Sequence, residues 1–428
     1  MKKILIFIQF KTFFSINADN TMKLYSRLVL LFLLFFISST QIAVAGSPPS
    51  PPLPLPTDNL NFDDLADALF EACNSATLGS DFEADCFDAL SDASRSLGAL
   101  TPDEIIANNA NITSSAIMDS FTRLALLRQI GGGASADSII SRFDVFANGH
   151  TSWQEYDRIN LNPGFNLFDS KVTIGADYRF TDNLIVGLTS SYLSSDSELK
   201  QGAGDIDTNG YAFSIYGSYY VGDSFFIDGT FAYADQRHRT LRNVAYTGVN
   251  QVATANVDSD TYSAGVITGY NFNFGGWTVT PTARWMYRNI QLEGYTESLS
   301  NPSGKGGSLV LAIGEQEYES ITGNFGTQVS YAWSQSWGVL MPTVSAEYIH
   351  EFANNSQSVN VRFVNAPTGT GGFTLRNSAM DRDYAAITAG FSAQFSKGLS
   401  AFVIYEKLLD LNSVTSDSLS MGVRMELD

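Results

Sequence analysis

The run SDTYSAGVITGYNFNFGGWTVTPTARWMYRNI, residues 259–290, decides the fold class. On either side of its central Gly-Gly pair, apolar and polar side chains alternate with a period of two. This period is typical of β-strands, because successive side chains point to opposite faces. One face carries aromatic residues near its ends, and the other carries Gly, Ser, Thr, Asn and Arg. A water-soluble sandwich would bury the apolar face in a core, whereas an outer-membrane barrel turns it toward lipid and keeps a polar lumen.

The same alternation predicts about twelve strands along the chain. We expect them near residues 139–150, 170–180, 184–194, 209–221, 224–236, 259–274, 277–290, 318–333, 337–351, 383–396, 399–408 and 416–427. Most of these segments reach the ~9–11 residues that a tilted strand needs to cross a bilayer.

The connections between these strands alternate in length and decide between the two fold classes. Short turns are expected at 181–183, 222–223, 275–276, 334–336 and 397–398, and long polar loops at 195–208, 237–258, 291–317 and 352–382. A sandwich has no reason to sort its connections in this way, but outer-membrane barrels combine short periplasmic turns with long extracellular loops. The sequence therefore predicts an all-β transmembrane fold, a 12-stranded antiparallel outer-membrane β-barrel.

Charged residues on the polar faces of the strands are predicted to line the lumen, because a basic side chain facing lipid at the bilayer midplane would cost ~2–4 kcal/mol. The predicted lumen residues are Asp177, Arg179, Asp228, Arg284, Arg288 and Glu347. Two roles are open for them. They clamp a helix inside the barrel, or they pair with one another along a hydrated wall.

Residues 1–45 are predicted to be a signal peptide. Basic starts at Met1 and Met22 each precede an apolar run, and Ala-Val-Ala at 43–45 has the small-x-small pattern of a cleavage site. A start at Met22 would give a signal of ordinary length. The apolar run 28–37 is too short for a membrane-spanning helix of ~20 residues. A Pro-rich spacer follows at residues 46–57.

In residues 58–102 the apolar period changes to that of amphipathic helices, with a break at 78–80. Cys73 and Cys86, the two cysteines of the chain, fall near the facing ends of the two predicted helices. Export to an oxidising compartment predicts a disulfide between them, and two free buried thiols are the alternative. Because the segment is rich in Asp and Glu, we expect it to be solvated and weakly packed. A further helix is predicted within residues 103–133, before a run of three glycines.

Composition and motifs argue against several classes of function. A formal net charge of −19 disfavours nucleic acid as a partner, since phosphate binding needs a basic surface. His150, His238 and His350 lack metal-ligand spacing, and no cofactor is expected. Two weak hydrolase signals remain, the triplet Gly-Asp-Ser at 222–224 and His238 among acidic residues of 237–258. Neither matches a catalytic motif, so no catalytic residue is assigned and the chain is not expected to be an enzyme.

Over residues 120–427 the chain resembles the translocator barrel of bacterial autotransporters, the type V secretion family. The matching segments, in the family's order, are GADYR at 175–179, GYNF at 269–272, TP at 280–281, EGYTE at 293–297, HEF at 350–352 and SVNVRF at 358–363. The resemblance implies a barrel over residues 139–428, a linker helix over 103–133 that threads its lumen, and an N-terminal passenger, here the helical segment 58–102.

Three features bear on that resemblance. Chains of the family usually end on an aromatic residue that the barrel-assembly machinery reads, whereas this chain has Leu427 followed by Asp428. The usual passenger is a long repetitive β-helix, but the segment before the barrel has no repeat period. Asn108 and Asn109 are similar to the pair at which some relatives cut their linker, although the flanking residues differ.

We therefore expect an outer-membrane protein of a Gram-negative bacterium, exported through the general secretory pathway, that translocates or displays its short passenger. One alternative is a structural barrel or adhesin that binds through its long loops without transport, and another is an outer-membrane hydrolase. The expected partners are outer-membrane lipid and lipopolysaccharide, periplasmic chaperones and the barrel-assembly machinery, and the barrel is expected to be a monomer.

Overall fold

The computed structural model describes residues 60–91, 124–125, 142–157, 164–222, 224–353, 358–376, 381–395, 398–411 and 414–427. Several predicted features lie outside these residues. They are the signal peptide 1–45, the spacer 46–57, the pair Asn108 and Asn109, and all of the linker helix 103–133 except Leu124 and Ala125.

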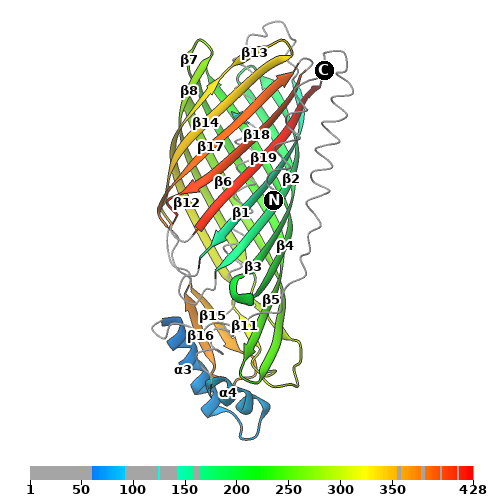
Figure 1. The fold of residues 1–428 in the computed structure, drawn as a ribbon, viewed down its shortest axis with the longest axis vertical. Helices are drawn as coiled ribbons and strands as arrows, with labels where there is room; N and C mark the ends of the chain where they lie inside the picture. Colours follow the sequence, from blue (N-terminus) through cyan, green and yellow to red (C-terminus); the bar gives the residue numbers. More distant parts are fainter. Residues whose placement is uncertain are drawn as a thin grey trace, which may run out of the picture. The chain divides into compact units, whose positions relative to one another are not determined.

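Most of the described residues belong to a closed antiparallel β-barrel of twelve strands (Figure 1). Each strand pairs with its neighbours in chain order, and the ring closes where β1 pairs with β19. The twelve strands are β1 (Phe143–Tyr156), β2 (Phe165–Thr181), β3 (Leu184–Leu199), β4 (Gly204–Val221), β5 (Phe225–Tyr246), β6 (Val249–Tyr270), β8 (Trp277–Leu292), β12 (Gln316–Tyr331), β14 (Gly338–Glu351), β17 (Asp383–Phe395), β18 (Leu399–Leu409) and β19 (Val414–Leu427). Two short strands, β7 (Phe272–Phe274) and β13 (Trp333–Gln335), follow β6 and β12 toward the short turns. The predicted fold class is confirmed.

The outer face of the barrel carries an apolar band between two belts of aromatic rings. Outward side chains in the band include Ile174, Ile215 and Val266, which are 61%, 49% and 50% exposed. The ring pairs near the short turns are Tyr178–Phe180, Tyr270–Phe272, Trp277–Tyr331 and Trp337–Phe395; those nearer the long connections are Trp153–Phe168, Tyr192–Tyr211 and Tyr233–Tyr262. An apolar band with aromatic girdles is the lipid-facing surface of an outer-membrane barrel.

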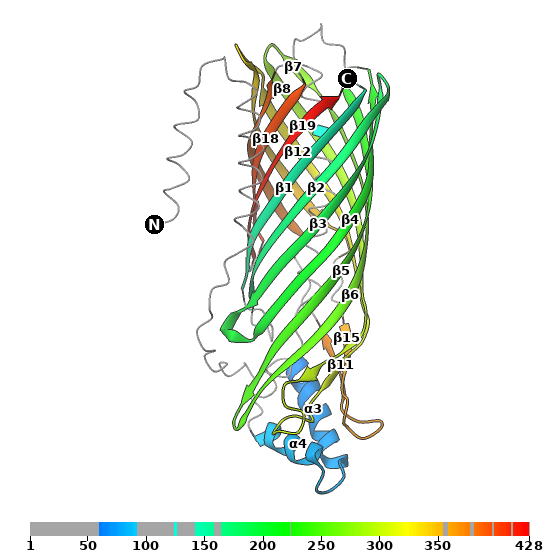
Figure 2. The same ribbon diagram turned by 90° about the vertical axis from the view of Figure 1, so that its right-hand side faces the viewer.

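The longest hairpin of the barrel continues well past the Tyr233–Tyr262 pair. β5 and β6 stay paired up to Tyr246↔Val249 (Figure 2). We predicted a polar loop over 237–258, and this prediction is wrong. Beyond the aromatic belt, toward the tip of this hairpin, the outer face no longer meets lipid, so charged residues such as Arg237 replace the apolar ones. The alternation of apolar and polar residues fades there while the backbone pairing continues. We call residues 237–258 the arm.

The other predicted long loops also contain regular structure. β3 and β4 extend through most of 195–208 and are joined by the short 3₁₀ helix η3 (Lys200–Gly202). The connections 291–317 and 352–382 hold β9 (Tyr295–Thr296), β10 (Ser298–Leu299), β11 (Leu311–Ile313), β15 (Ser358–Phe363) and β16 (Gly372–Arg376). β10 pairs with β6 inside the arm. The other four strands form a separate sheet in the order β16-β15-β11-β9, which we call the loop sheet.

Two helices precede the barrel in the chain, α3 (Leu60–Ser75) and α4 (Asp81–Ser91), and we call residues 60–91 the helical hairpin. They agree with the helices and the break expected from the sequence. Gly79, with a φ of 79°, makes the tight connection between them. Ser80 caps α4, since its hydroxyl accepts a hydrogen bond of 3.1 Å from the backbone N–H of Glu83. None of the described helices is long and apolar enough to cross a membrane.

Candidate functional site

The six charged residues predicted to line the lumen alternate with the outward side chains and so lie on the inner face of the wall. Asp228 is fully buried and accepts a hydrogen bond of 2.6 Å from the hydroxyl of Ser218. Arg284 donates to the carboxylate of Glu347, two strands away. Asp177 is buried, and Arg179 and Arg288 are partly buried. These contacts of Asp228 and Arg284 join residues of the barrel wall. Asp177, Asp228 and Arg288 have further interactions as well, so both roles given for the set from the sequence stay predictions.

A further ion pair at the closing seam was not singled out from the sequence. Arg424 on β19 donates to Asp144 on β1 at 2.6 Å, and both side chains are 7% exposed. The signal was available, because Arg424 belongs to the polar face of the last strand. The alternation of polar and apolar residues did not identify Asp144 as its partner, because β1 becomes a neighbour of β19 only when the barrel closes.

The three histidines lie in separate places, as expected, and the described residues hold no cluster of His, Cys, Asp or Glu suited to a metal ion. His238 contacts the hydroxyls of Thr208 and Ser259 at 2.8 Å each. Ser224, the other hydrolase candidate, directly precedes β5, fourteen residues from His238, so the two lie about 45 Å apart at 3.2–3.4 Å per residue. The structure does not bring these two candidates together.

One described point of the chain between the helices and the barrel lies inside the lumen. Leu124 is fully buried in a cluster with Phe146, Ile185 and Tyr216, whose side chains point inward from β1, β3 and β4. Tyr216 also donates a hydrogen bond of 3.0 Å to the predicted lumen residue Asp177. A side chain placed on Gly187 would meet the ring of Tyr216 at 2.3 Å, so this glycine makes room for the ring. Leu124 therefore sits in an apolar pocket of an otherwise polar wall.

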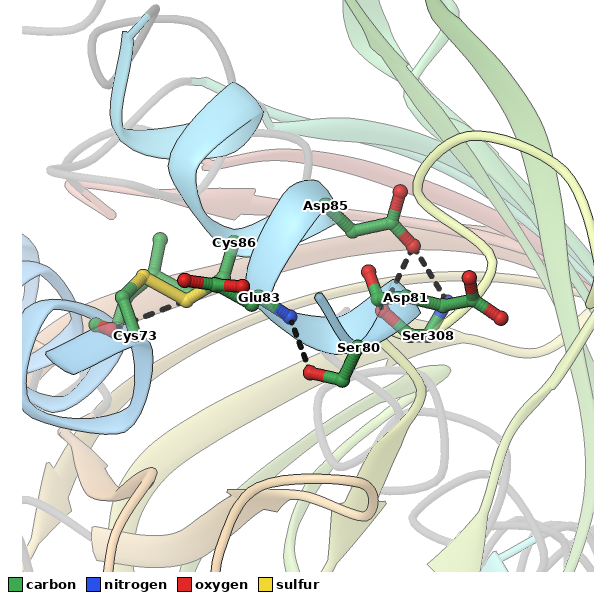
Figure 3. Close-up of a disulfide and its surroundings, with 8 residues drawn as sticks. Cys73, Ser80, Asp81, Glu83, Asp85, Cys86 and Ser308 are labelled. Atoms are coloured by element: carbon green, nitrogen blue, oxygen red, sulfur yellow. Dashed lines mark hydrogen bonds between the residues drawn. A yellow bond between two sulfur atoms is a disulfide. The ribbon is translucent and has the colours of Figure 1, made fainter. Parts of the chain in front are cut away.

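The helical hairpin is held together by a covalent bond between its two helices. Cys73 and Cys86 form a disulfide with a Cα–Cα distance of 5.5 Å (Figure 3). Both cysteines are buried. The apolar stripes of the two helices turn to one side of the hairpin. They consist of Leu65, Leu69 and Ala72 on α3 and of Phe82, Cys86 and Ala89 on α4. This side is the part of the hairpin that packs on the rest of the protein.

The seat of the hairpin is built from the long connections of the barrel. One buried cluster joins its apolar stripes to the tip of the arm and to the loop sheet with its flanking turn. The seat residues in this cluster are Val244, Tyr246, Val249, Ala253, Leu299, Leu309, Leu311, Ile313, Val359, Val361, Phe363, Phe373 and Leu375. Full burial of a Leu or Phe stabilises a structure by about 1.5–3 kcal/mol. We expected a solvated, weakly packed segment, and this prediction is wrong, because one face of the hairpin is part of a shared core.

A buried carboxylate fixes the hairpin in this seat. Asp85 on α4 accepts hydrogen bonds from Ser308, from its backbone N–H at 3.0 Å and its hydroxyl at 2.7 Å (Figure 3). It also accepts one from the backbone N–H of Gly306 at 2.6 Å. Gly306 has a φ of 74°, the left-handed conformation that lets neighbouring N–H groups converge on an anion. Nearby, Lys305 forms an exposed ion pair of 3.4 Å with Asp88.

The seat is tied to the arm by polar contacts of its own. Arg242 on β5 and Glu297, between β9 and β10, form a two-pronged ion pair with both side chains 4% exposed. The amide of Gln251 on β6 donates to the carbonyls of Asn301 and Lys305 and accepts from the N–H of Asn301. The turn that receives Asp85 is therefore held by the arm. We call the helical hairpin, the arm and the loop sheet, with the connecting residues 291–317, the cap module.

Sequence reasoning missed these residues for different reasons. Asp85 lies on the apolar stripe of α4 between Phe82 and Ala89, and an acid inside a buried stripe is a usable signal for a specific partner. Arg242 and Glu297 gave no signal, because 55 residues separate them and both stood in segments predicted to be loops.

Comparisons with known proteins point in one direction. Residues 145–406 match the family model described as the autotransporter beta-domain. The chain is similar to Lipase 1 of Photorhabdus luminescens, with 22% identity over 54% of this chain and 34% of that protein. It is similar to outer membrane protein A of Rickettsia conorii, with 24% identity over 65% of this chain and 14% of that protein. It thus spans about a third or less of the length of these relatives.

Solved structures show the same fold. The translocator domain of the autotransporter NalP from Neisseria meningitidis superposes with a TM-score of 0.54 and 16% identity, covering 75% of this chain and all of that one. The β-domain of the Bordetella autotransporter BrkA gives a TM-score of 0.50 and 16% identity, covering 67% of this chain and all of that one.

Proposed function

Because the chain belongs to the family of autotransporter β-domains, we propose that it carries its own helical hairpin outward through the barrel and keeps it docked there as a cap. The barrel itself is an outer-membrane translocator domain. The observation that supports outward display is the contact between the buried carboxylate of Asp85 and the turn at Gly306 and Ser308. This turn belongs to the long connections. In barrels of this kind the long connections lie outside the cell and the short turns lie in the periplasm.

The path of the chain supports the same proposal. The hairpin packs at the tip of the arm, whereas β1 begins at Phe143, in register with the last residues of β19 and so at the short-turn end. Residues 92–142 must therefore connect the two ends of the barrel. Leu124 lies on the inner face of the wall between them, which favours a path through the lumen over one through lipid.

The test is the position of the hairpin in intact cells. An epitope inserted in the turn at 77–79 should bind antibody in intact cells, because all three residues of this turn are exposed. The same epitope at 275–276, in a short turn, should bind only after the outer membrane is opened. Protection of the 77–79 epitope in intact cells would contradict outward display.

Retention is a separate part of the proposal and has a separate readout. If the hairpin stays docked, the antibody against the 77–79 epitope should detect a chain in the membrane fraction that contains both the hairpin and the barrel. A hairpin fragment in the culture medium would instead indicate cleavage and release. Export through the general secretory pathway is likewise proposed, and it predicts that blocking signal-peptide cleavage leaves a longer precursor.

A second candidate function is adhesion through the long connections without transport of the hairpin. The loop sheet favours it, because a folded sheet outside the membrane is a rigid surface for a partner. Deleting residues 60–91 separates the two candidates. Binding to cells that survives the deletion would favour the loops, and binding that is lost would favour the hairpin. We assign no catalytic role to the chain in either case.

A further inference from the structure

The face of the helical hairpin that points away from its seat exposes three large apolar side chains. Phe70 is 58% exposed, Leu78 89% and Phe87 46%. Phe70 lies one turn before Cys73 and Phe87 directly follows Cys86, so the disulfide holds the two rings at the same level of the hairpin. These side chains lie far from the lipid-facing band of the barrel. Apolar groups gathered on a surface that meets water mark an interaction site.

Carboxylates surround this apolar face. The hairpin contains eight acidic residues and no Lys or Arg. Asp85 and Asp88 turn toward the seat, where Gly306, Ser308 and Lys305 meet them. Asp81 is exposed too, but its backbone carbonyl accepts a hydrogen bond from the seat residue Ser308. The exposed acids on the free side are Asp63, Asp67 and Glu71. On α3 they recur with Phe70 along one stripe at positions 63, 67, 70 and 71, which is helical spacing.

We propose that this free face of the hairpin, around Phe70 and Phe87, binds a cationic amphipathic helix. The apolar stripe of such a helix would cover the two rings, and its Lys or Arg residues would meet the flanking carboxylates, as in other helix–groove complexes. Charge decides among the other occupants. Nucleic acid, anionic lipid headgroups and a second copy of the hairpin all carry the same sign as this face and are repelled.

The inference rests on the proposed function only in so far as the face must be displayed to meet a partner outside the cell. Its test uses the purified full chain in nanodiscs of phosphatidylcholine, and therefore does not depend on cell-surface display. The probe is a fluorescent synthetic helix of about 18 residues, or five turns, with Leu on one stripe and Lys on the other. A second probe has Glu in place of every Lys. Anisotropy titrations measure the affinity of each.

We expect the Lys probe to bind and the Glu probe to bind at least about tenfold more weakly, with the difference shrinking as salt is added. The variant Phe70→Ser/Phe87→Ser should lose about tenfold or more in affinity for the Lys probe, as removal of central aromatic contacts usually does. Replacing Asp63, Asp67 and Glu71 by their amides should weaken binding and reduce its salt dependence.

The matched control is Asn74→Ala/Thr77→Ala, which changes two exposed polar residues of the same hairpin and should leave the affinity unchanged. Mass spectrometry of the intact disulfide and protease resistance of the hairpin establish that each variant is folded and docked. Three results would overturn the inference: equal affinity for both probes, wild-type affinity of the Phe70→Ser/Phe87→Ser variant, or binding no stronger than to empty nanodiscs.

Discussion

The strands β5 and β6 pass through two environments, and the polarity of their faces differs between the two. In the half between the aromatic belts, which we call the membrane half, Ile227 and Phe231 face outward to lipid while Asp228 and Thr230 face the lumen. In the arm the exposed face carries Arg237, paired with Asp258 at 2.9 Å, and the inner face becomes apolar toward the tip. The backbone pairing is the same in both halves, residue by residue.

The difference teaches that one hairpin can reverse the polarity of its faces without a break in its hydrogen bonds. In the membrane half, apolar side chains on the outside of the barrel are favoured because they contact lipid. In the arm, the outside meets water, and the inside packs against the helical hairpin and the loop sheet in an ordinary core. The arm, which continues the barrel wall, thus forms part of the cap module.

The largest expected effect comes from breaking the buried ion pair of the cap module. Arg242→Met leaves the carboxylate of Glu297 buried without its partner, which should destabilise the module by about 3–5 kcal/mol. Hydrogen exchange of residues 237–258 in the purified protein should rise while exchange in the rest of the barrel stays unchanged. The control is Arg242→Met/Glu297→Leu, which removes both charges and should recover most of the protection. Equal exchange in the single and double variants would argue against the pairing.

The membrane half of β5 and β6 is tested by placing one charge on either face. Val266→Arg puts a cation in the lipid-facing band and should cost ~2–4 kcal/mol, so that less of the protein shows the heat-modifiable mobility of a folded barrel. Thr230→Arg is the control at the same level, because Thr230 lies opposite Gly265 and faces the lumen two residues from Asp228. It should assemble almost normally, as we also expect of the lumen-facing change Ser263→Arg. Similar assembly of Val266→Arg and Thr230→Arg would contradict the assignment of the faces.

The disulfide should matter for the cap module and not for the barrel. It closes a loop with a sequence separation of 13, for which chain entropy gives a stabilisation of about 3 kcal/mol. Cys73→Ser/Cys86→Ser should therefore make residues 60–91 more sensitive to protease in intact cells, with no change in heat modifiability. A loss of assembled barrel in this variant would show that the two parts are not independent.

The smallest of the four effects is expected at the contact between α4 and its seat. Asp85→Ala leaves the N–H groups of Gly306 and Ser308 without their acceptor. With water hydrating one of the two groups, the expected loss of stability of the docked hairpin is about 1–3 kcal/mol in total. Protease should then cut the hairpin faster. The comparison is Lys305→Met, which removes only an exposed ion pair worth about 0–1 kcal/mol. Equal protease sensitivity of both variants would mean that Asp85 is not what holds the hairpin.

The sequence was sufficient for the barrel because lipid imposes a repeating constraint on single strands. Each apolar face, such as that of Val266, could be recognised without knowing its neighbours. The cap module obeys no such local rule. Val244 and Tyr246 became core residues only through contact with segments far away in the chain, and a single-strand pattern holds no record of these contacts. Asp85 was also missed, but its sequence did hold a local signal, since an acid on an apolar stripe indicates a buried partner.

The helical hairpin and the barrel belong to one chain, and this has a consequence for how the hairpin dissociates. In an uncleaved chain the hairpin cannot diffuse away when it undocks, because it stays covalently tethered to β1. Reassociation is then intramolecular, and for short tethers the effective concentration is on the order of mM. Even a weak contact would therefore re-form at once. The helical hairpin can undock from its seat while a partner binds and then return to it.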